Sequence, residues 1–236
     1  DAYKSLDEAL VHGGIANNVK VNLVRIDSDN LKNNEIKAKH KNVSGLLIPG
    51  GFGKRGTEGK ISAIKYAREN KIPFLGICFG MQMAIIEFAR NMLKIKNAGS
   101  SELDKRCYPV IGLINEWDKN GKIVKGTDKN LGGTMRLGLY EAKLKNNSAI
   151  NRIYKSNSIK ERHRHRYEVN NNLKDQFERK GLIFSGMSPD YKLPEIIELK
   201  NHPWFIGVQF HPEFKSRPLA PHPLFSSFIK AAKNHK

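Results

Sequence analysis

Cysteine is scarce in this sequence, which holds only Cys78 and Cys107 among its 236 residues. Two cysteines so far apart, with no secretory segment before them, do not form the disulfide framework of a small secreted domain. The sequence also lacks an apolar run long enough to cross a membrane. We therefore exclude a disulfide-stapled or membrane-spanning protein and expect a soluble, cytoplasmic one.

Acidic residues are also few: 23 Asp and Glu stand against 41 Lys and Arg, which gives a formal net charge of +18. An excess of this size is typical of nucleic-acid-binding proteins, so a basic binding module is one hypothesis. Against it, the lysines are spread along predicted surface positions, which favours a solubilising surface over a shaped groove. With 39% hydrophobic residues, the chain can bury a core as one domain.

The order of predicted elements is typical of an α/β fold. Short apolar runs predict strands, amphipathic segments predict helices, and the two alternate along the chain. We predict strands at 19–26, 43–48, 72–77, 195–199 and 204–210, and helices at 5–13, 61–70, 80–93 and 223–232. The first helix is expected to stop at Gly13-Gly14. Between 97 and 158, weak alternation predicts antiparallel strands and long loops. The fold class is therefore α/β, with a doubly wound, mostly parallel sheet, helices on both faces and an antiparallel region in the middle.

A glycine-rich loop, Gly51-Phe52-Gly53-Lys54-Arg55-Gly56, satisfies the dinucleotide-binding fingerprint. However, Pro49-Gly50-Gly51 breaks the strand that should lead into it. The phosphate-binding P-loop pattern also fails around Gly59-Lys60, because Lys54 stands where a glycine is required and Ile61 where Ser or Thr is required. We interpret the loop as small residues whose backbone N–H groups can face an anion.

A thiol stands between two glycines at the end of a predicted strand, in Gly76-Ile77-Cys78-Phe79-Gly80. This matches a nucleophile elbow with Cys in place of Ser, because the tight strand-to-helix turn tolerates only small flanking residues. At the N-terminus of the helix 80–93, the dipole favours the thiolate, and the N–H of Phe79 can stabilise an oxyanion. On this pattern alone, a small buried core cysteine is an equal alternative.

A cysteine nucleophile needs a base, and His211 is the candidate. In His211-Pro212-Glu213 an apolar strand has just ended, and residues two apart in extended chain point to the same side. Pro212 keeps His211 out of the helical region. We predict His211 as general base and then general acid, and Glu213 as the group that fixes its tautomer. Taken alone, His211 would more often be a strand-end histidine that caps a loop, and the elbow beside it reverses that preference.

Three motifs occur in the order found in one family: 49–53, 76–82 and 209–214. Together they resemble those of the class I, triad-type glutamine amidotransferases, whose fold is flavodoxin-like. Finer similarities point to the glutaminase domains of CTP synthases, and the likeness extends over nearly the whole chain. They lie at Ser100-Ser101-Glu102, 131–138, 161–169 and 211–218.

The resemblance implies roles for the residues that match the family's motifs. Cys78 would attack the side-chain amide of glutamine, release ammonia and leave a γ-glutamyl thioester, with His211 as acid and base and Glu213 orienting it. Gly51 and Phe79 would supply the N–H groups of the oxyanion hole. The glutamine-binding positions would be Gly51, Phe52, Phe79, Gly80, Met81, Gln82, Glu102, Arg166 and Tyr167.

Charge complementarity agrees with two of these positions. Glu102 offers a carboxylate for the substrate's ammonium group and Arg166 a guanidinium for its α-carboxylate. Arg166 ends the basic cluster 162–166, which could otherwise be an RNA-binding or metal-binding tract. We favour a loop or strand that places Arg166 in the glutamine pocket, and we find no residue spacing typical of a zinc site.

The resemblance also implies partners. Residues 1–236 would be the glutaminase domain alone, and ammonia would pass to a synthetase domain of the same polypeptide, which this chain does not contain, for ATP-dependent amination of UTP to CTP. ATP, Mg²⁺ and UTP are expected only on that domain, and this domain is expected to need no cofactor and no metal. GTP would be an allosteric activator near Phe52, Arg55 and the loop 54–59. The full-length protein is expected to be a homo-oligomer, a tetramer, without nucleic-acid or membrane partners.

Two other functions remain open on the sequence. One is a different thiol hydrolase of the same fold, either a γ-glutamyl hydrolase or a peptidase. The other is the basic nucleic-acid-binding module, with an inactive pocket.

Overall fold

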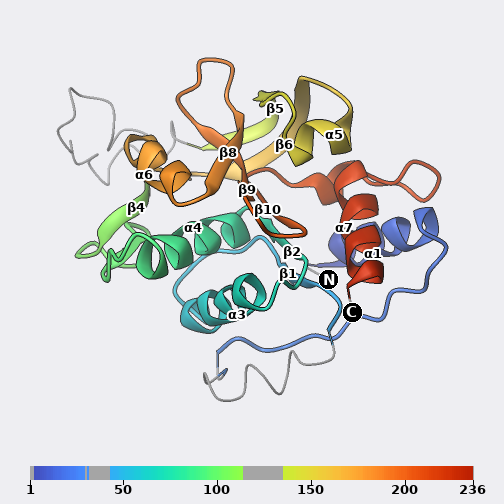
Figure 1. Cartoon of the computed structure of the whole chain (residues 1–236), viewed down its shortest axis with the longest axis horizontal. Helices are drawn as coiled ribbons and strands as arrows, with labels where there is room; N and C mark the ends of the chain where they lie inside the picture. The colour runs from blue at the N-terminus through green and yellow to red at the C-terminus, as the bar shows by residue number, and fades with distance from the viewer. Residues whose placement is uncertain (1–2, 30, 32–42, 114–134, 236) are drawn as a thin grey trace.

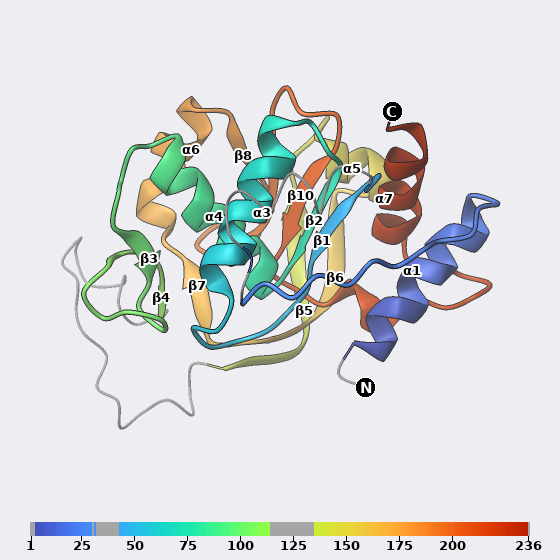
Figure 2. The same cartoon turned by 90° about the horizontal axis from the view of Figure 1, so that it is seen from below.

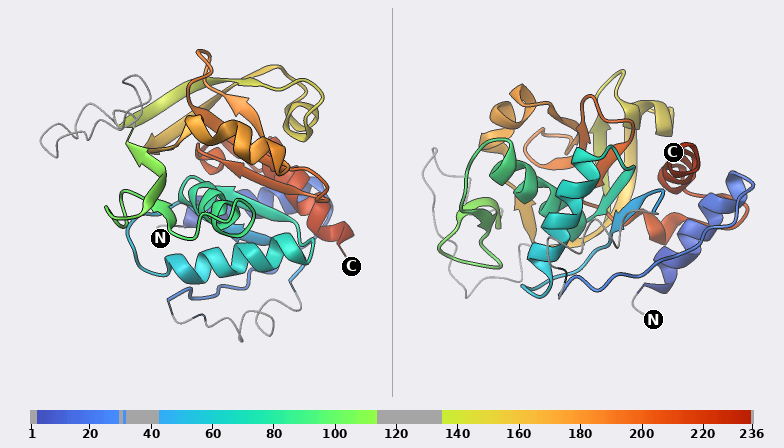
Figure 3. Two further views of the ribbon diagram at one scale, coloured as in Figure 1. Left: turned by 60° about the vertical axis from the view of Figure 1, so that its left-hand side comes forward. Right: turned by 60° about the horizontal axis from the view of Figure 1, so that its bottom comes forward.

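A seven-stranded mixed sheet runs through the molecule (Figure 1). The computed structural model describes residues 3–29, 31, 43–113 and 135–235. In spatial order the strands are β1 (Leu46–Ile48), β2 (Phe74–Ile77), β10 (Phe205–Val208), β9 (Pro194–Leu199), β8 (Leu182–Met187), β5 (Arg136–Leu144) and β6 (Ser158–His165). β1 and β6 therefore form opposite edges of the sheet, and Figure 3 shows β5 and β6 far from α3.

The sheet is less parallel than the sequence predicts. β2 pairs in parallel with both β1 and β10, whereas β10–β9, β9–β8, β8–β5 and β5–β6 are antiparallel. Antiparallel neighbours need only short connections, and the chain between 136 and 208 supplies strands without long crossover helices. The α/β class is confirmed, but among the described strands of this sheet the parallel pairs are confined to the three strands that surround Cys78.

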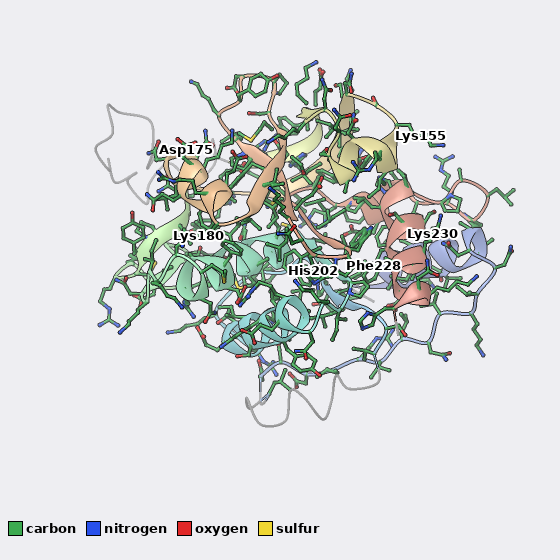
Figure 4. The ribbon with its side chains drawn as sticks, viewed as in Figure 1. Lys155, Asp175, Lys180, His202, Phe228 and Lys230 are labelled. Carbon is green, nitrogen blue, oxygen red and sulfur yellow. The ribbon has the colours of Figure 1, made fainter. Side chains whose placement is uncertain are left out.

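Helices cover both faces of the sheet, as the sequence predicts (Figure 2). Successive strand residues point to opposite faces, so Phe74 packs toward α3 (Thr57–Glu69) and α4 (Phe79–Asn91). Leu75 packs on the other side, with α1 (Lys4–Ala16), α5 (Ala149–Tyr154) and α7 (Pro223–Asn234). Phe228 of α7, labelled in Figure 4, contacts Trp204 with ring centroids 5.3 Å apart. The core therefore has two layers.

A smaller sheet lies against α4. It consists of β3 (Ala98–Ser100), β4 (Tyr108–Leu113) and β7 (Tyr167–Val169), with β3–β4 parallel and β4–β7 antiparallel. It is followed by the short helices η3 (Asn171–Leu173) and α6 (Lys174–Arg179). Because β7 directly follows β6, this sheet brings residues 166 and 167 toward the start of α4.

Two predictions near the N-terminus are wrong. α1 continues through Gly13 and Gly14 to Ala16. A Cβ at Gly13 would lie 2.7 Å from the carbonyl oxygen of Phe225, so this glycine allows α1 and α7 to approach each other and does not stop the helix. The segment 19–26 is not a strand, and its alternating valines, Val19 and Val21, pack on the α1–α7 layer without a ladder partner.

The other predicted helices exist with shifted ends, since α3 begins at Thr57 and α7 continues to Asn234. Residues 131–134 of the motif at 131–138 lie outside the described residues. No helix in the described part of the chain is long and apolar enough to cross a bilayer.

Candidate active site

Cys78 lies at the turn between β2 and α4. Its backbone has φ of +51° and ψ of −102°, a conformation that L-residues rarely adopt, and its side chain is buried. A Cβ at Gly80 would collide with the carbonyl of Ile48, and one at Gly76 would lie 2.8 Å from the carbonyl carbon of Gly80. The spacing of glycines in the sequence thus corresponds to a turn packed tightly against β1.

The glycine-rich loop lies beside this turn. A Cβ at Gly51 would lie 3.8 Å from Cδ1 of Phe79, which places Gly51 and Phe79 side by side. Phe79 is the first residue of α4, and its N–H has no acceptor within the helix. A Cβ at Gly50 would lie 2.7 Å from Cε1 of His211. The loop therefore borders the cysteine and the histidine, as an oxyanion-binding loop must.

His211 is held by Glu213 and by the neighbouring strand. Its Nδ1 lies 2.7 Å from Oε1 of Glu213, and its backbone N–H donates to the carbonyl of Arg162 at 2.8 Å. Burial would lower the pKa of His211, but hydrogen bonds to Cys78 and Glu213, with the charges of both groups, outweigh burial and raise the pKa to about 10. The cationic form of the imidazole is thus stabilised by its position between Cys78 and Glu213.

His211 and Glu213 are in contact as the sequence predicts, but the backbone that brings them together is not the extended chain that the sequence argument assumed. β10 ends at Val208, and Glu213 lies in a 3₁₀ turn, η4 (Pro212–Lys215), rather than in extended chain. Pro212 is the first residue of this turn, where its missing N–H costs nothing. The two side chains meet because the turn folds back.

The predicted glutamine-binding residues come from three elements. Gln82, on α4, donates from Nε2 to the carbonyl of Tyr167 at 3.0 Å. Glu102 accepts from the N–H of Gly53 at 3.3 Å, and burial raises the pKa of its carboxyl. Arg166 is half-buried at the junction of β6 and β7. Glu102 therefore borders the glycine-rich loop, and Gln82 joins α4 to the carbonyl of the residue that follows Arg166.

Other predicted binding residues take different positions. Met81 is fully buried in the core, and the Phe79 side chain is also buried, so either could meet a ligand only through its backbone. Phe52 is 89% exposed on the glycine-rich loop. Gly80 lies inside the turn, against Ile48. Cys78 and Cys107 are not joined by a disulfide, as the sequence predicts.

The basic cluster 162–166 is divided by the alternation of β6. Arg162 and Arg164 point to solvent, and His163 and His165 point inward, with 2.9 Å between His163 Nδ1 and His165 Nε2. Burial, with the nearby charge of Arg136, lowers the pKa of His163 to about 2 and that of His165 to about 3. Both histidines are therefore neutral.

Arg136 is a buried charge that sequence reasoning missed. Its guanidinium bonds Glu168 at 3.1 Å and Glu195 at 2.7 Å, next to the two histidines. Burial raises the pKa of Glu168 to about 8 although Arg136 lowers it. Among the described residues, no three His, Cys, Asp or Glu side chains converge as metal ligands would.

Gln209 is a second residue that sequence reasoning missed. Its side chain is fully buried, and its Nε2 lies 3.7 Å from Sγ of Cys78. The available signal was a single amide within the apolar run 204–210, directly before His211.

The family model of class I glutamine amidotransferases matches residues 1–231. The sequence is 80% identical over its full length to a CTP synthase of Pelagibacter ubique and 59% identical over 98% of it to one of Zymomonas mobilis. The glutaminase domain of a Trypanosoma brucei CTP synthase, solved with bound acivicin, superposes with a TM-score of 0.88 at 34% identity, and the match covers 100% of this chain and 89% of that one. The chain belongs to the class I glutamine amidotransferases, among the glutaminase domains of CTP synthases.

This amidotransferase domain shares its fold more widely. A putative GMP synthase subunit of Thermoplasma acidophilum superposes with a TM-score of 0.58 at 17% identity, which is a likeness of fold alone. The domain spans 44% and 43% of the lengths of the two curated CTP synthases, so it corresponds to less than half of each.

Proposed function

We propose that this domain hydrolyses L-glutamine to glutamate and ammonia through Cys78, His211 and Glu213. The observation that carries the proposal is the position of His211, whose Nδ1 lies 2.7 Å from Oε1 of Glu213 and whose ring borders Gly50 together with Cys78. This arrangement supplies a nucleophilic thiolate and a proton donor in one site.

The first half-reaction forms a bond from Sγ of Cys78 to the side-chain amide carbon of glutamine. Negative charge develops on the amide oxygen, and the N–H groups of Gly51 and Phe79 are the proposed donors to it. His211 transfers its proton to the amide nitrogen, which leaves as ammonia. The product on the enzyme is a γ-glutamyl thioester.

The second half-reaction consumes water. His211, now neutral, accepts a proton from the water that attacks the thioester, and the thiolate leaves as glutamate forms. Glu213 keeps Nδ1 of His211 protonated and stabilises the imidazolium in both steps. Glu102 and Arg166 are the proposed partners of the substrate's ammonium and carboxylate groups, which gives selectivity for free glutamine over a glutamine residue within a peptide chain.

The proposal extends to a longer protein in which ammonia passes to a synthetase domain for ATP- and Mg²⁺-dependent amination of UTP to CTP. The identity to proteins named CTP synthase supports it, since more than half of each relative lies outside the matched part. GTP activation is proposed at the loop that carries the exposed Phe52, with Arg55 paired to Asp29 beside it. A cytoplasmic, tetrameric full-length protein completes the proposal on the same resemblance.

Labelling with a glutamine-analogue electrophile tests the proposed reaction. We expect one adduct, on Cys78, that peptide mapping locates and that glutamine competes away. Cys107→Ser, which removes the other thiol, should label as the unchanged protein does, and Cys78→Ala should not label. An adduct elsewhere, or none on the folded protein, would overturn the proposal. Equal hydrolysis of γ-glutamyl peptides would instead favour a γ-glutamyl hydrolase.

A further inference from the structure

Gln209 lies directly behind the nucleophile, where β10 has ended. Its backbone N–H donates to the carbonyl of Glu195 at 2.9 Å, and the N–H of Cys78 donates to the carbonyl of the preceding residue, Val208, at 2.7 Å. These two bonds fix the backbones of Gln209 and Cys78 next to each other. The fully buried Gln209 amide then has Nε2 3.7 Å from Sγ of Cys78.

The direction of this amide is set by its neighbours. The carbonyl of Tyr167 can only accept, so the Gln82 side chain must turn Nε2 toward it, at 3.0 Å. That same Nε2 lies 3.3 Å from Gln209, which must therefore present its oxygen. The NH₂ group of Gln209 is left facing the sulfur, and a flipped amide would set two donors against each other and an oxygen against the thiolate.

The chain of contacts continues past the active site. The carbonyl of Tyr167 also lies 3.2 Å from Nδ1 of His165, and His165 contacts His163. The Tyr167 carbonyl, at the junction between β6 and β7, thus fixes the orientation of both side-chain amides, Gln82 and Gln209. Arg166 lies at the same junction. The nucleophile and two of the proposed glutamine-binding residues share one hydrogen-bonded path.

We propose that Gln209 holds and stabilises the Cys78 thiolate by donating a hydrogen bond to Sγ, and that it links the nucleophile to Gln82. The inference rests on the proposed glutamine hydrolysis and deepens it. His211 attracts the thiolate by charge, and Gln209 adds a neutral donor to the same sulfur. Loss of a hydrogen bond to a charged group corresponds to about a 10- to 100-fold effect on a rate.

The test compares Gln209→Met, which has similar volume but no donor, with Ser185→Ala as a matched control. Ser185 is also fully buried, lies on β8, and loses a hydroxyl that the structure leaves without a partner. His211 and Glu213, the charged groups placed against Cys78, stay in both variants. The readout is the pH profile of Cys78 alkylation by iodoacetamide, which does not depend on glutamine turnover.

In Gln209→Met we expect the midpoint of alkylation to move to higher pH by about 1, because the thiolate loses a donor. We also expect kcat for glutamine to fall about 10- to 100-fold, by more than KM rises. Ser185→Ala should leave both unchanged. A folded Gln209→Met protein with the unchanged alkylation profile would overturn the inference. Failure of the unchanged protein to label at Cys78 would overturn the proposed function instead.

A measurement on the unchanged chain covers the case in which Gln209→Met does not fold. In protein labelled with ¹⁵N in glutamine side chains, the Gln209 NH₂ resonances should shift as Cys78 loses its proton. The same shift should be absent in Cys78→Ala. Resonances that do not respond to the thiol in the unchanged protein would contradict the inference.

Discussion

His211 is restrained on several sides at once. Glu213 holds Nδ1, Arg162 accepts from its backbone N–H, and Phe214 stacks on the ring with centroids 5.4 Å apart. The ring can therefore direct its other nitrogen, Nε2, toward Cys78 without losing much rotamer freedom on reaction. This restraint suits a group that must deliver a proton and take one back in the same place.

The charge of Glu213 should set the alkaline limit of activity. In Glu213→Gln, loss of the carboxylate lowers the pKa of His211, so the alkaline fall of kcat should move to lower pH, and kcat itself should fall by about 10²–10⁴-fold. Measurement of ammonia release between pH 6 and 11 checks both. Glu141→Gln is the control. Glu141 pairs with Lys143 on β5, so this substitution removes the same charge at another place in the molecule. An unmoved alkaline limit would contradict the assigned role of Glu213.

At the scale of elements, the tight contact between α4 and β1 supports the nucleophile turn. In Gly80→Ala the new Cβ would collide with the carbonyl of Ile48, so α4 must shift. We expect a loss of unfolding free energy of about 1–3 kcal/mol, measured by urea denaturation. Gly51→Ala is the matched comparison, because its Cβ would meet nothing closer than 3.8 Å, and its unfolding free energy should change little. Equal losses in both variants would refute this explanation.

The sequence predicted best those elements whose cause is local. The elbow glycines, the short apolar strand before Cys78 and the largely apolar helix α4 each depend on a few adjacent residues, and the structure contains all three. The segment 19–26 misled because a period of two shows only that alternate residues are buried. Here Val19 and Val21 are only half-buried, they pack on helices, and no ladder forms.

The parts that sequence reasoning missed depend on residues far apart in the chain. Arg136 bonds Glu168 and Glu195, and no spacing rule joins these three positions. The role of Gln209 can be recognised only in the structure, where Gln82 and Tyr167 fix the orientation of its side-chain amide. The antiparallel half of the sheet was underestimated for the same reason, since pairing partners are set by tertiary packing.

For the whole molecule, the excess of positive charge is dispersed. Lys155, Lys180 and Lys230 are exposed on α5, α6 and α7, in different parts of the surface (Figure 4). Lys155 and Lys180 occupy the C-caps of their helices, where the negative end of the dipole stabilises a cation. Part of the net charge therefore serves helix ends, which supports the interpretation of a solubilising surface.

The buried titratable groups predict a stability maximum near pH 6.5. Burial lowers the pKa values of His163, His165 and His202 to about 2, 3 and 4, so in acid the unfolded chain binds protons that the folded chain refuses. Stability should fall as the pH drops from 6.5 toward 4. On the alkaline side, the folded chain keeps a proton on Glu168, with a pKa raised to about 8, and on His211, with a pKa of about 10. The unfolded chain releases both earlier, so stability should also fall as the pH rises above 6.5.

Urea unfolding at constant ionic strength from pH 4.5 to 9.5 measures this profile. Glu168→Gln keeps an oxygen acceptor for Arg136 but removes the titrating carboxyl, whose pKa rises from 4.5 to about 8 on folding. It should therefore reduce the fall in stability between pH 6.5 and 8 and steepen the rise in stability between pH 4.5 and 6.5. Stability that continues to rise up to pH 9 would contradict the assignment.

The positive φ of Cys78 sets the stability of this chain against its reactivity. A non-glycine residue held in such a conformation costs about 1–3 kcal/mol, and glycine would relieve much of it, yet glycine carries no thiol. Selection for thermal stability alone would therefore favour glycine at position 78, and the protein would lose the sulfur of Cys78. The packing of the two core layers on either side of the sheet must therefore stabilise the fold by more than this strained turn destabilises it.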